Sequence, residues 1–194
     1  MMNVLILGHS FVSNLKRSCE NPGKPHEWED PVNARGKVSV QMHGYPGGRV
    51  KTLITAIEAG LFVHYTPHVV ICQIGGNVCS NKCFDEKAFE TDLDTFIDAC
   101  LTRGVLGIVF MSVLKRSKPR YCSSDEYTSR QQIVNRIMKN KAVVHYAVHY
   151  FKPTSVYRDE YEALDGVHFT EEGYLAFLVA LRKALSWVIN KVNK

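Results

Sequence analysis

Short runs of consecutive apolar residues recur along the chain. The first run, residues 4–7, is Val-Leu-Ile-Leu, and a glycine, a histidine and a serine follow it. Apolar runs of this length, without alternation of polar residues, are typical of β-strands that are buried on both faces of a sheet. The pattern therefore predicts five strands, at residues 4–7, 38–42, 69–74, 107–113 and 142–148.

Between these runs, apolar residues recur at the spacing of an amphipathic helix. The segment 50–60 shows this spacing and ends at Gly60, a residue type that commonly follows the last turn of a helix. Ser10 would lie at the N-terminus of a first helix directly after the first strand. Three further helices are predicted, at residues 85–104, at residues 123–140 and after Thr170.

The alternation of strands and helices favours a parallel sheet with helices on both faces. We therefore predict a single domain over residues 1–194, of the α/β class. It would be a three-layer α/β/α sandwich with about five parallel strands in the flavodoxin-like order 2-1-3-4-5. The segment 18–35 is rich in proline, glycine and charged residues, and a long surface loop is expected there.

The composition is that of an ordinary globular protein, with 45% hydrophobic and 22% charged residues. The net charge of +5 is mild and gives only weak support to a nucleic-acid partner. The longest apolar stretch, residues 174–189, contains Arg182 and Lys183 and is shorter than the about 20 residues that span a bilayer. Because no secretory signal is visible either, we expect a cytoplasmic location.

Cysteine usage adds little to this interpretation. Without an export signal the cysteines are expected to be reduced thiols, with Cys72 and Cys100 in the core. Cys79 and Cys83 are spaced C-x3-C, but no C-x2-C pair accompanies them, so neither a structural zinc site nor any other cofactor is expected. The six cysteines are Cys19, Cys72, Cys79, Cys83, Cys100 and Cys122.

Residues with catalytic potential follow three of the predicted strands and precede the last helix. Because ligands of open parallel sheets bind beyond the carboxyl ends of the strands, these residues can face one edge of the sheet. A hydroxyl, backbone amides, a carboxamide and an Asp/His pair are together the parts of an acyl-transfer site. The residues are Ser10, the 47–48 glycine pair, Asn77, Asp165 and His168.

In such a site Ser10 would attack a carbonyl carbon, His168 would accept the serine proton and Asp165 would hold the imidazole tautomer. The N–H of Ser10, an N–H of the 47–48 turn and the Asn77 amide would stabilise the oxyanion. Taken one at a time, the same residues also have structural interpretations. Ser10 can cap a helix, Asn77 can bond its own backbone in a turn, and the glycines can simply form a turn.

Taken together and in this order, the motifs resemble those of the SGNH hydrolases, also called GDSL esterases and lipases. Residues 8–10, Gly-His-Ser, are similar to the family's Gly-Asp-Ser block, and residues 75–78, Gly-Gly-Asn-Val, to its Gly-x-Asn-Asp block. Residues 165–168 match its Asp-x-x-His block. The family's remaining glycine is matched by Gly48, with Gly47 as the alternative.

The resemblance implies a serine esterase that cleaves a carboxylic ester (short acyl, acetyl or lipid) through an acyl-enzyme intermediate. It implies a triad of Ser10, Asp165 and His168, and an oxyanion hole of Ser10, Gly48 and Asn77. His9 and Val78 stand where the family has aspartates, and these departures can weaken the support of the site. The Gly-His-Ser-Phe stretch is also similar to SGNH-like domains of animal mobile elements.

A second hypothesis is a catalytically weak or inactive SGNH-like domain that binds RNA, other nucleic acid or protein. The presence of a complete set of site residues favours the enzyme. The basic segment 115–120, expected to be a solvated loop at the same edge, keeps weak nucleic-acid contact open as an alternative. Its candidate contacts to an anionic ligand are Lys115, Arg116, Lys118 and Arg120. The sequence defines neither the substrate nor the oligomeric state.

Overall fold

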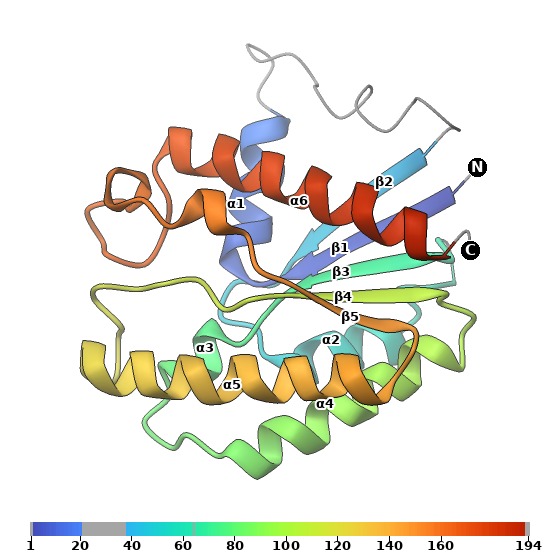
Figure 1. Cartoon of the computed structure of the whole chain (residues 1–194), viewed down its shortest axis with the longest axis horizontal. Coiled ribbons are helices and arrows are strands. Elements are labelled where there is room, and N and C mark those ends of the chain that lie inside the picture. The colour runs from blue at the N-terminus through green and yellow to red at the C-terminus, as the bar shows by residue number, and fades with distance from the viewer. Residues whose placement is uncertain (1, 21–37, 64, 193–194) are drawn as a thin grey trace.

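The computed structural model describes residues 2–20, 38–63 and 65–192. Within these residues, five parallel strands form one sheet in the order β2-β1-β3-β4-β5 (Figure 1). The predicted α/β class, parallel pairing and strand order are confirmed. The strands are β1 (Met2–Gly8), β2 (Val38–Gly44), β3 (Val69–Gln73), β4 (Gly107–Met111) and β5 (Val148–Phe151).

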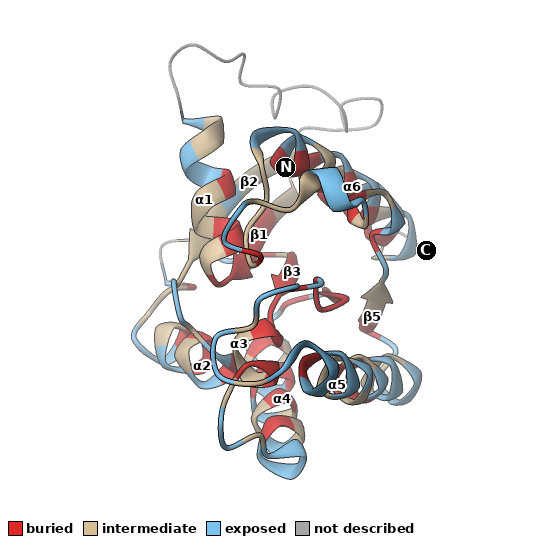
Figure 2. Ribbon diagram, turned by 90° about the vertical axis from the view of Figure 1, so that its left-hand side faces the viewer, coloured by how far each residue is buried: buried red, intermediate tan, exposed pale blue. Residues whose placement is uncertain are grey.

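The central strands are buried on both faces because helices cover the sheet on each side (Figure 2). Successive side chains of a strand point to opposite faces. In β1, Val4 and Ile6 therefore pack with α1 (Ser10–Cys19) and α6 (Glu171–Val192). The alternate residues of the strand pack on the other face with α2 (Val50–Glu58), α4 (Glu86–Leu101) and α5 (Ser124–Val144).

The fifth strand lies later in the chain than the sequence predicted. Residues 142–144 continue α5, where Val143 and Val144 are 86% and 75% exposed, and β5 begins only at Val148. The backbone N–H of His145 still donates to the Lys141 carbonyl, which completes the last helical turn. The apolar run at 142–148 was therefore wrongly interpreted as one buried strand, because its first half is solvent-exposed helix.

Of the predicted loop at 18–35, residues 18 and 19 belong to α1, and residues 21–35 lie outside the described residues. Between β5 and α6 the chain forms two 3-10 turns, η2 (Thr154–Val156) and η3 (Asp159–Tyr161).

Cys72 and Cys100 are buried in the core, as predicted. Across the described ranges, no helix combines the length and the apolar character needed to cross a membrane.

Candidate active site

The site begins where β1 ends. Gly8 is paired with Gly44 of β2 and Gln73 of β3, so the ends of these three strands lie side by side. A Cβ atom on Gly8 would lie 2.6 Å from the Gln73 carbonyl oxygen, which leaves room only for glycine at this strand end. The chain then turns at His9 and enters α1, whose first residue is Ser10.

Ser10 lies at the N-terminus of α1, as the sequence predicted. The His9 carbonyl accepts the backbone N–H groups of Val12 and Ser13 at 3.1 and 3.2 Å, which starts the helix. The N–H of the first helical residue has no intrahelical acceptor, and the positive end of the helix dipole lies at the same place. The Ser10 amide is therefore suited to bind negative charge beside its own hydroxyl.

The loop before α6 places His168 by means of Asp165. Asp165 Oδ1 accepts the backbone N–H groups of Val167 and His168, both at 2.9 Å, and Oδ2 lies 2.6 Å from His168 Nδ1. Partial burial by itself would raise the pKa of Asp165, but these hydrogen bonds outweigh it and lower the pKa to about 2. The carboxylate is therefore ionised at neutral pH and orients the imidazole ring.

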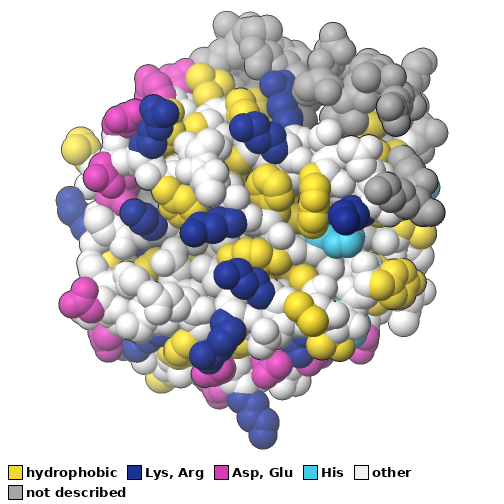
Figure 3. Space-filling view, in the orientation of Figure 1, with side chains coloured by type: hydrophobic (Ala, Val, Ile, Leu, Met, Phe, Trp, Pro, Cys, Tyr) yellow, Lys and Arg dark blue, Asp and Glu magenta, His cyan; other side chains and the backbone are white. Residues whose placement is uncertain are grey.

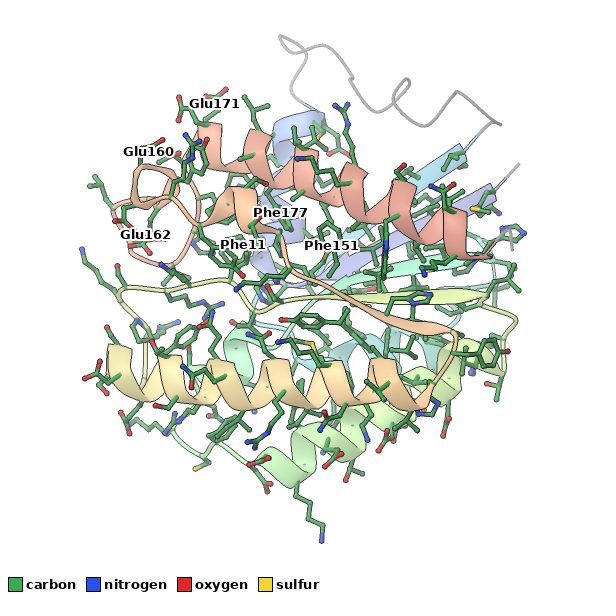
Figure 4. The ribbon with its side chains drawn as sticks, viewed as in Figure 1. Phe11, Phe151, Glu160, Glu162, Glu171 and Phe177 are labelled. Carbon is green, nitrogen blue, oxygen red and sulfur yellow. The ribbon has the colours of Figure 1, made fainter. Side chains whose placement is uncertain are left out.

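Ser10 and His168 meet across the sheet edge. The Ser10 Oγ atom lies 2.8 Å from His168 Nε2, which is within hydrogen-bond distance. Phe11, labelled in Figure 4, packs against this pair, and its ring centroid lies 5.6 Å from that of His168. Phe11 was not among the site residues predicted from the sequence. Its position directly after the serine, on the buried side of α1, was the available signal.

Asn77 lies in the short helix α3 (Gly76–Cys79), which directly follows the end of β3. Its side-chain Nδ2 donates to the Gly48 carbonyl oxygen at 2.9 Å, and its Oδ1 accepts a hydrogen bond from Arg116 Nη2 at 3.1 Å. The second N–H of the amide has no acceptor among the described residues. Asn77 is thus held by the tertiary fold and not, as a turn residue would be, by its own backbone.

Gly48 differs from the sequence expectation. Its backbone N–H donates to the Tyr45 carbonyl at 2.7 Å in a turn that has Pro46 and then Gly47, at φ +74°, in its central positions. This is the arrangement of a type II turn. The amide of Gly48 is therefore engaged within the turn, and the contact that Gly48 makes to the site is through its carbonyl, which holds Asn77.

The two departures from the family motifs have different environments. His9 is 2% exposed, and neither ring nitrogen has a hydrogen-bond partner among the described residues. Burial, the charge of Arg116 and the proximity of His168 lower the pKa of His9 to about 3, so its ring is neutral at physiological pH. Val78 is partly buried against the core on the α4 and α5 side of the sheet.

The cations of the basic segment at 115–120 are exposed as predicted, with one exception. Arg116 is only 7% exposed, so the expectation that it belongs to a solvated anion-binding loop is wrong. Its guanidinium group instead bonds inward to Asn77 and Ser80, which charge alone could not reveal in the sequence. Lysine and arginine side chains are spread over the face drawn in Figure 3. The exposed members of the segment include Lys115, Lys118 and Arg120.

A small cavity adjoins the imidazole of His168. Its volume is about 30 Å³, and it lies beneath the turns that connect β5 to α6. Its lining is mixed. The apolar part comes from Leu114, Val156, Val167 and Phe169, and the polar part includes Lys115, Tyr157, Arg158, Asp159 and Glu162. Across residues 2–20, 38–63 and 65–192, no group of three or more His, Cys, Asp or Glu side chains is placed to hold a metal ion.

Comparison with protein families links this arrangement to known hydrolases. The sequence profile of the GDSL-like lipase/acylhydrolase family matches residues 6–176. The matched segment contains Ser10, Asn77, Asp165 and His168, which are the residues that carry the geometry described above. Among curated proteins, none matches the chain significantly.

Solved structures share the fold at low sequence identity. A GDSL-like lipase from Bacteroides thetaiotaomicron has a TM-score of 0.70 at 16% identity, with 94% of this chain and 87% of that chain covered. The lipase/acylhydrolase from Enterococcus faecalis has a TM-score of 0.71 at 14% identity, with 96% of each chain covered. A catalytic mutant of an acetylxylan esterase from Geobacillus stearothermophilus has a TM-score of 0.65 at 13% identity, covering 94% and 93%.

Proposed function

Because the chain belongs to the GDSL-like lipase/acylhydrolase family, whose members are ester hydrolases, we propose that Ser10, His168 and Asp165 cleave a carboxylic ester through an acyl-enzyme intermediate. The observation that carries this proposal is the hydrogen-bonded chain from Ser10 Oγ through the imidazole to the Asp165 carboxylate. Its two links measure 2.8 and 2.6 Å. A serine hydroxyl is a weak nucleophile unless a base accepts its proton, and the His168 imidazole is placed to be that base.

In the proposed acylation step, Ser10 Oγ attacks the ester carbonyl carbon while His168 Nε2 takes the hydroxyl proton. Nε2 can accept only when the ring carries its own proton on Nδ1, and the Asp165 carboxylate holds the ring in that tautomer. The same carboxylate stabilises the imidazolium that forms. Because the pKa of Asp165 is about 2, this support is present throughout the neutral range.

The tetrahedral intermediate carries a negative charge on the former carbonyl oxygen. We assign its stabilisation to the Ser10 backbone N–H, at the start of α1, and to the second N–H of the Asn77 amide. The N–H of Gly48 would have to leave the Tyr45 carbonyl before it could join them. Loss of a single donor of this kind typically costs about 100- to 1,000-fold in rate.

The remaining steps use the same side chains and one water molecule. Collapse of the intermediate breaks the bond between the carbonyl carbon and the alcohol oxygen, and His168 passes its proton to the departing alcohol. A water molecule then attacks the acyl-Ser10 carbonyl while His168 takes one of its protons. The second collapse breaks the bond to Ser10 Oγ, returns the proton to it and releases the carboxylic acid.

The cavity beside His168 supports a short acyl group. A volume of about 30 Å³ can hold a group the size of a methyl, and the apolar part of the lining, which includes Val156, Val167 and Phe169, can contact such a group. We therefore propose an acetyl or similarly short ester as the substrate, in preference to a long-chain lipid ester. Activity on p-nitrophenyl acetate should exceed activity on the butyrate and octanoate esters, and the opposite order would contradict this choice.

Labelling with a fluorophosphonate probe tests the nucleophile. The probe should modify Ser10 in the wild-type protein and Ser18→Ala, a control two turns further along α1, and should leave Ser10→Ala unlabelled. Peptide mapping would identify the modified residue. Hydrolysis of p-nitrophenyl acetate should be lost in Ser10→Ala and kept in Ser18→Ala. Labelling at another residue, or turnover that Ser10→Ala leaves intact, would overturn the proposal.

A further inference from the structure

Arg116 is a buried cation that lies next to the proposed oxyanion site. It follows the carboxyl end of β4, is 7% exposed and has no carboxylate partner among the described residues. Its Nε atom also lacks a hydrogen-bond partner there. A buried charge without a counter-ion is costly, so a position of this kind calls for a role other than ion pairing.

The guanidinium group is placed by three neighbours. Nη1 donates to Ser80 Oγ at 3.0 Å, and the group lies over the ring of Tyr127 with its Cζ atom 5.7 Å from the ring centroid. Nη2 reaches Asn77 Oδ1 at 3.1 Å. A Cβ atom on Gly76 would lie 2.8 Å from Nη2, so the glycine makes room for this approach. Arg116 is therefore held in one orientation against Asn77.

These contacts determine which way the Asn77 amide faces. Arg116 has only donors, so it accepts no bond from the NH₂ group and can pair only with Oδ1. The Gly48 carbonyl has only acceptor capacity, so it selects an N–H. A flipped amide would place donor against donor on one side and acceptor against acceptor on the other. One orientation remains, and it leaves the second N–H free.

We propose that Arg116 is a positioning residue of the oxyanion hole, which acts by holding the Asn77 amide with its second N–H toward the oxyanion. The inference rests on the proposed function of Asn77 as an oxyanion donor. It adds that this function depends on the buried Arg116. Because the effect passes through Asn77, it should disappear when Asn77 is absent.

Kinetics of p-nitrophenyl acetate hydrolysis test this dependence. Arg116→Met should lower kcat by about tenfold to a hundredfold and change KM little, since part of one oxyanion donor is lost. Arg116→Lys keeps the charge but lacks the planar pair of donors, so most of the loss should remain. If Arg116→Met fails to fold, Arg116→Gln takes its place. Near-wild-type kcat in these variants would overturn the inference.

Arg130 provides a matched control. It is a second partly buried arginine and donates from α5 to the Cys79 and Asn81 carbonyls at 3.2 and 2.8 Å. It therefore holds the same segment as Arg116, but among the described residues it forms no hydrogen bond to the Asn77 side chain. Arg130→Met should leave kcat within about twofold of wild type, even if it lowers the thermal stability. An equal kcat loss in both variants would show that Arg116 acts only as a structural support.

A double-mutant cycle separates positioning from a direct effect of charge. In the Asn77→Ala background, adding Arg116→Met should change kcat less than about twofold, because the group through which Arg116 acts is already gone. Losses that multiply, so that the double variant falls a further tenfold or more, would overturn the inference in favour of direct stabilisation of the oxyanion by the Arg116 charge.

An NMR measurement keeps the inference separate from the proposed function. The two side-chain N–H signals of Asn77 can be assigned by their loss in Asn77→Asp. In Arg116→Met they should shift and exchange faster with water, and in Arg130→Met they should not. Unchanged signals in Arg116→Met overturn the inference whatever the activity. If the wild-type protein shows no Ser10-dependent turnover, the proposed function fails while this measurement still decides the positioning.

Discussion

Asp165 contacts His168 through both of its carboxylate oxygens. Oδ1 accepts the His168 backbone N–H at 2.9 Å, and Oδ2 lies 2.6 Å from Nδ1 of the ring. The first contact shapes the loop before α6, and the second orients the imidazole toward Ser10. Asp165 thus has a structural role and a chemical role, and a single substitution can remove the second while keeping the first.

Asp165→Asn should keep the loop and lose the chemistry. The asparagine oxygen can still accept the backbone N–H groups, while its NH₂ group would face Nδ1 and drive the ring proton to Nε2, where it blocks proton transfer from Ser10. We expect kcat to fall on the order of 1,000- to 10,000-fold, with little change in melting temperature. Asp98→Asn, on the exposed side of α4, is the control. Retained activity would show that the tautomer is held by another group.

Ser10 and His168 should behave as one unit. Each of Ser10→Ala and His168→Ala should abolish turnover of p-nitrophenyl acetate down to the level supplied by the oxyanion hole alone. Because neither residue is useful without the other, the double variant should be hardly worse than either single variant. Asn77→Ala should retain a small residual activity. Losses that multiply in the double variant would argue against a shared step.

His9 should make the protein less stable in mild acid. Its pKa is lowered from 6.5 to about 3 in the folded state, by burial first and then by the charges of Arg116 and His168. Between these values the unfolded chain binds a proton that the folded protein does not, so stability falls as the pH falls. The slope contributed by His9 is at most about 1.4 kcal/mol per pH unit.

Urea unfolding between about pH 4.5 and 6.5 measures this contribution. His9→Leu should show a shallower loss of unfolding free energy toward acid than the wild-type protein. His43 and His149, whose pKa values burial also lowers, contribute to both proteins and cancel in the comparison. Asp165, with a pKa of about 2, acts only at lower pH. Parallel pH profiles for the two proteins would show that the pKa of His9 is the same in the folded and the unfolded state.

Any affinity for single-stranded nucleic acid should be weak and electrostatic. The exposed cations of the basic segment are Lys115, Lys118 and Arg120, since Arg116 is buried. Three phosphate contacts would give a slope of roughly −2 for log affinity against log salt concentration. Neutralising the three side chains should abolish the binding, as followed by fluorescence anisotropy. Tight binding that persists at high salt would instead favour the binding-module hypothesis.

The sequence could predict the parts of this protein that depend on local pattern. Apolar runs between helices predicted the parallel sheet, because strands buried on both faces need no polar residues. Ser10 and the Asp165–His168 pair could be found because strand ends and a four-residue motif place them. The proton chain itself depends on two segments that are 158 residues apart, and the geometry came only from the structure.

Three features could not be predicted from the pattern of apolar and polar residues. The run at 142–148 reads as a strand because hydrophobicity does not reveal that Val143 and Val144 face solvent at the end of α5. Arg116 reads as one of several surface cations, because its burial depends on the room that Gly76 leaves at another strand end. The N–H of Gly48 was expected to be free, and the turn that engages it became visible only as a hydrogen bond to Tyr45.

The packing of α1 against α6 has a consequence for when the site can form during synthesis of the protein. Phe11 of α1 lies 6.4 Å from Phe177 of α6, measured between ring centroids, and the hydrophobic cluster around this pair joins β1 and α1 to α6 (Figure 4). During synthesis Ser10 is made before His168, and the imidazole cannot be placed beside the serine until α6 has left the ribosome and packed on α1. Hydrolysis therefore requires that the whole segment from β1 to α6 has been synthesised.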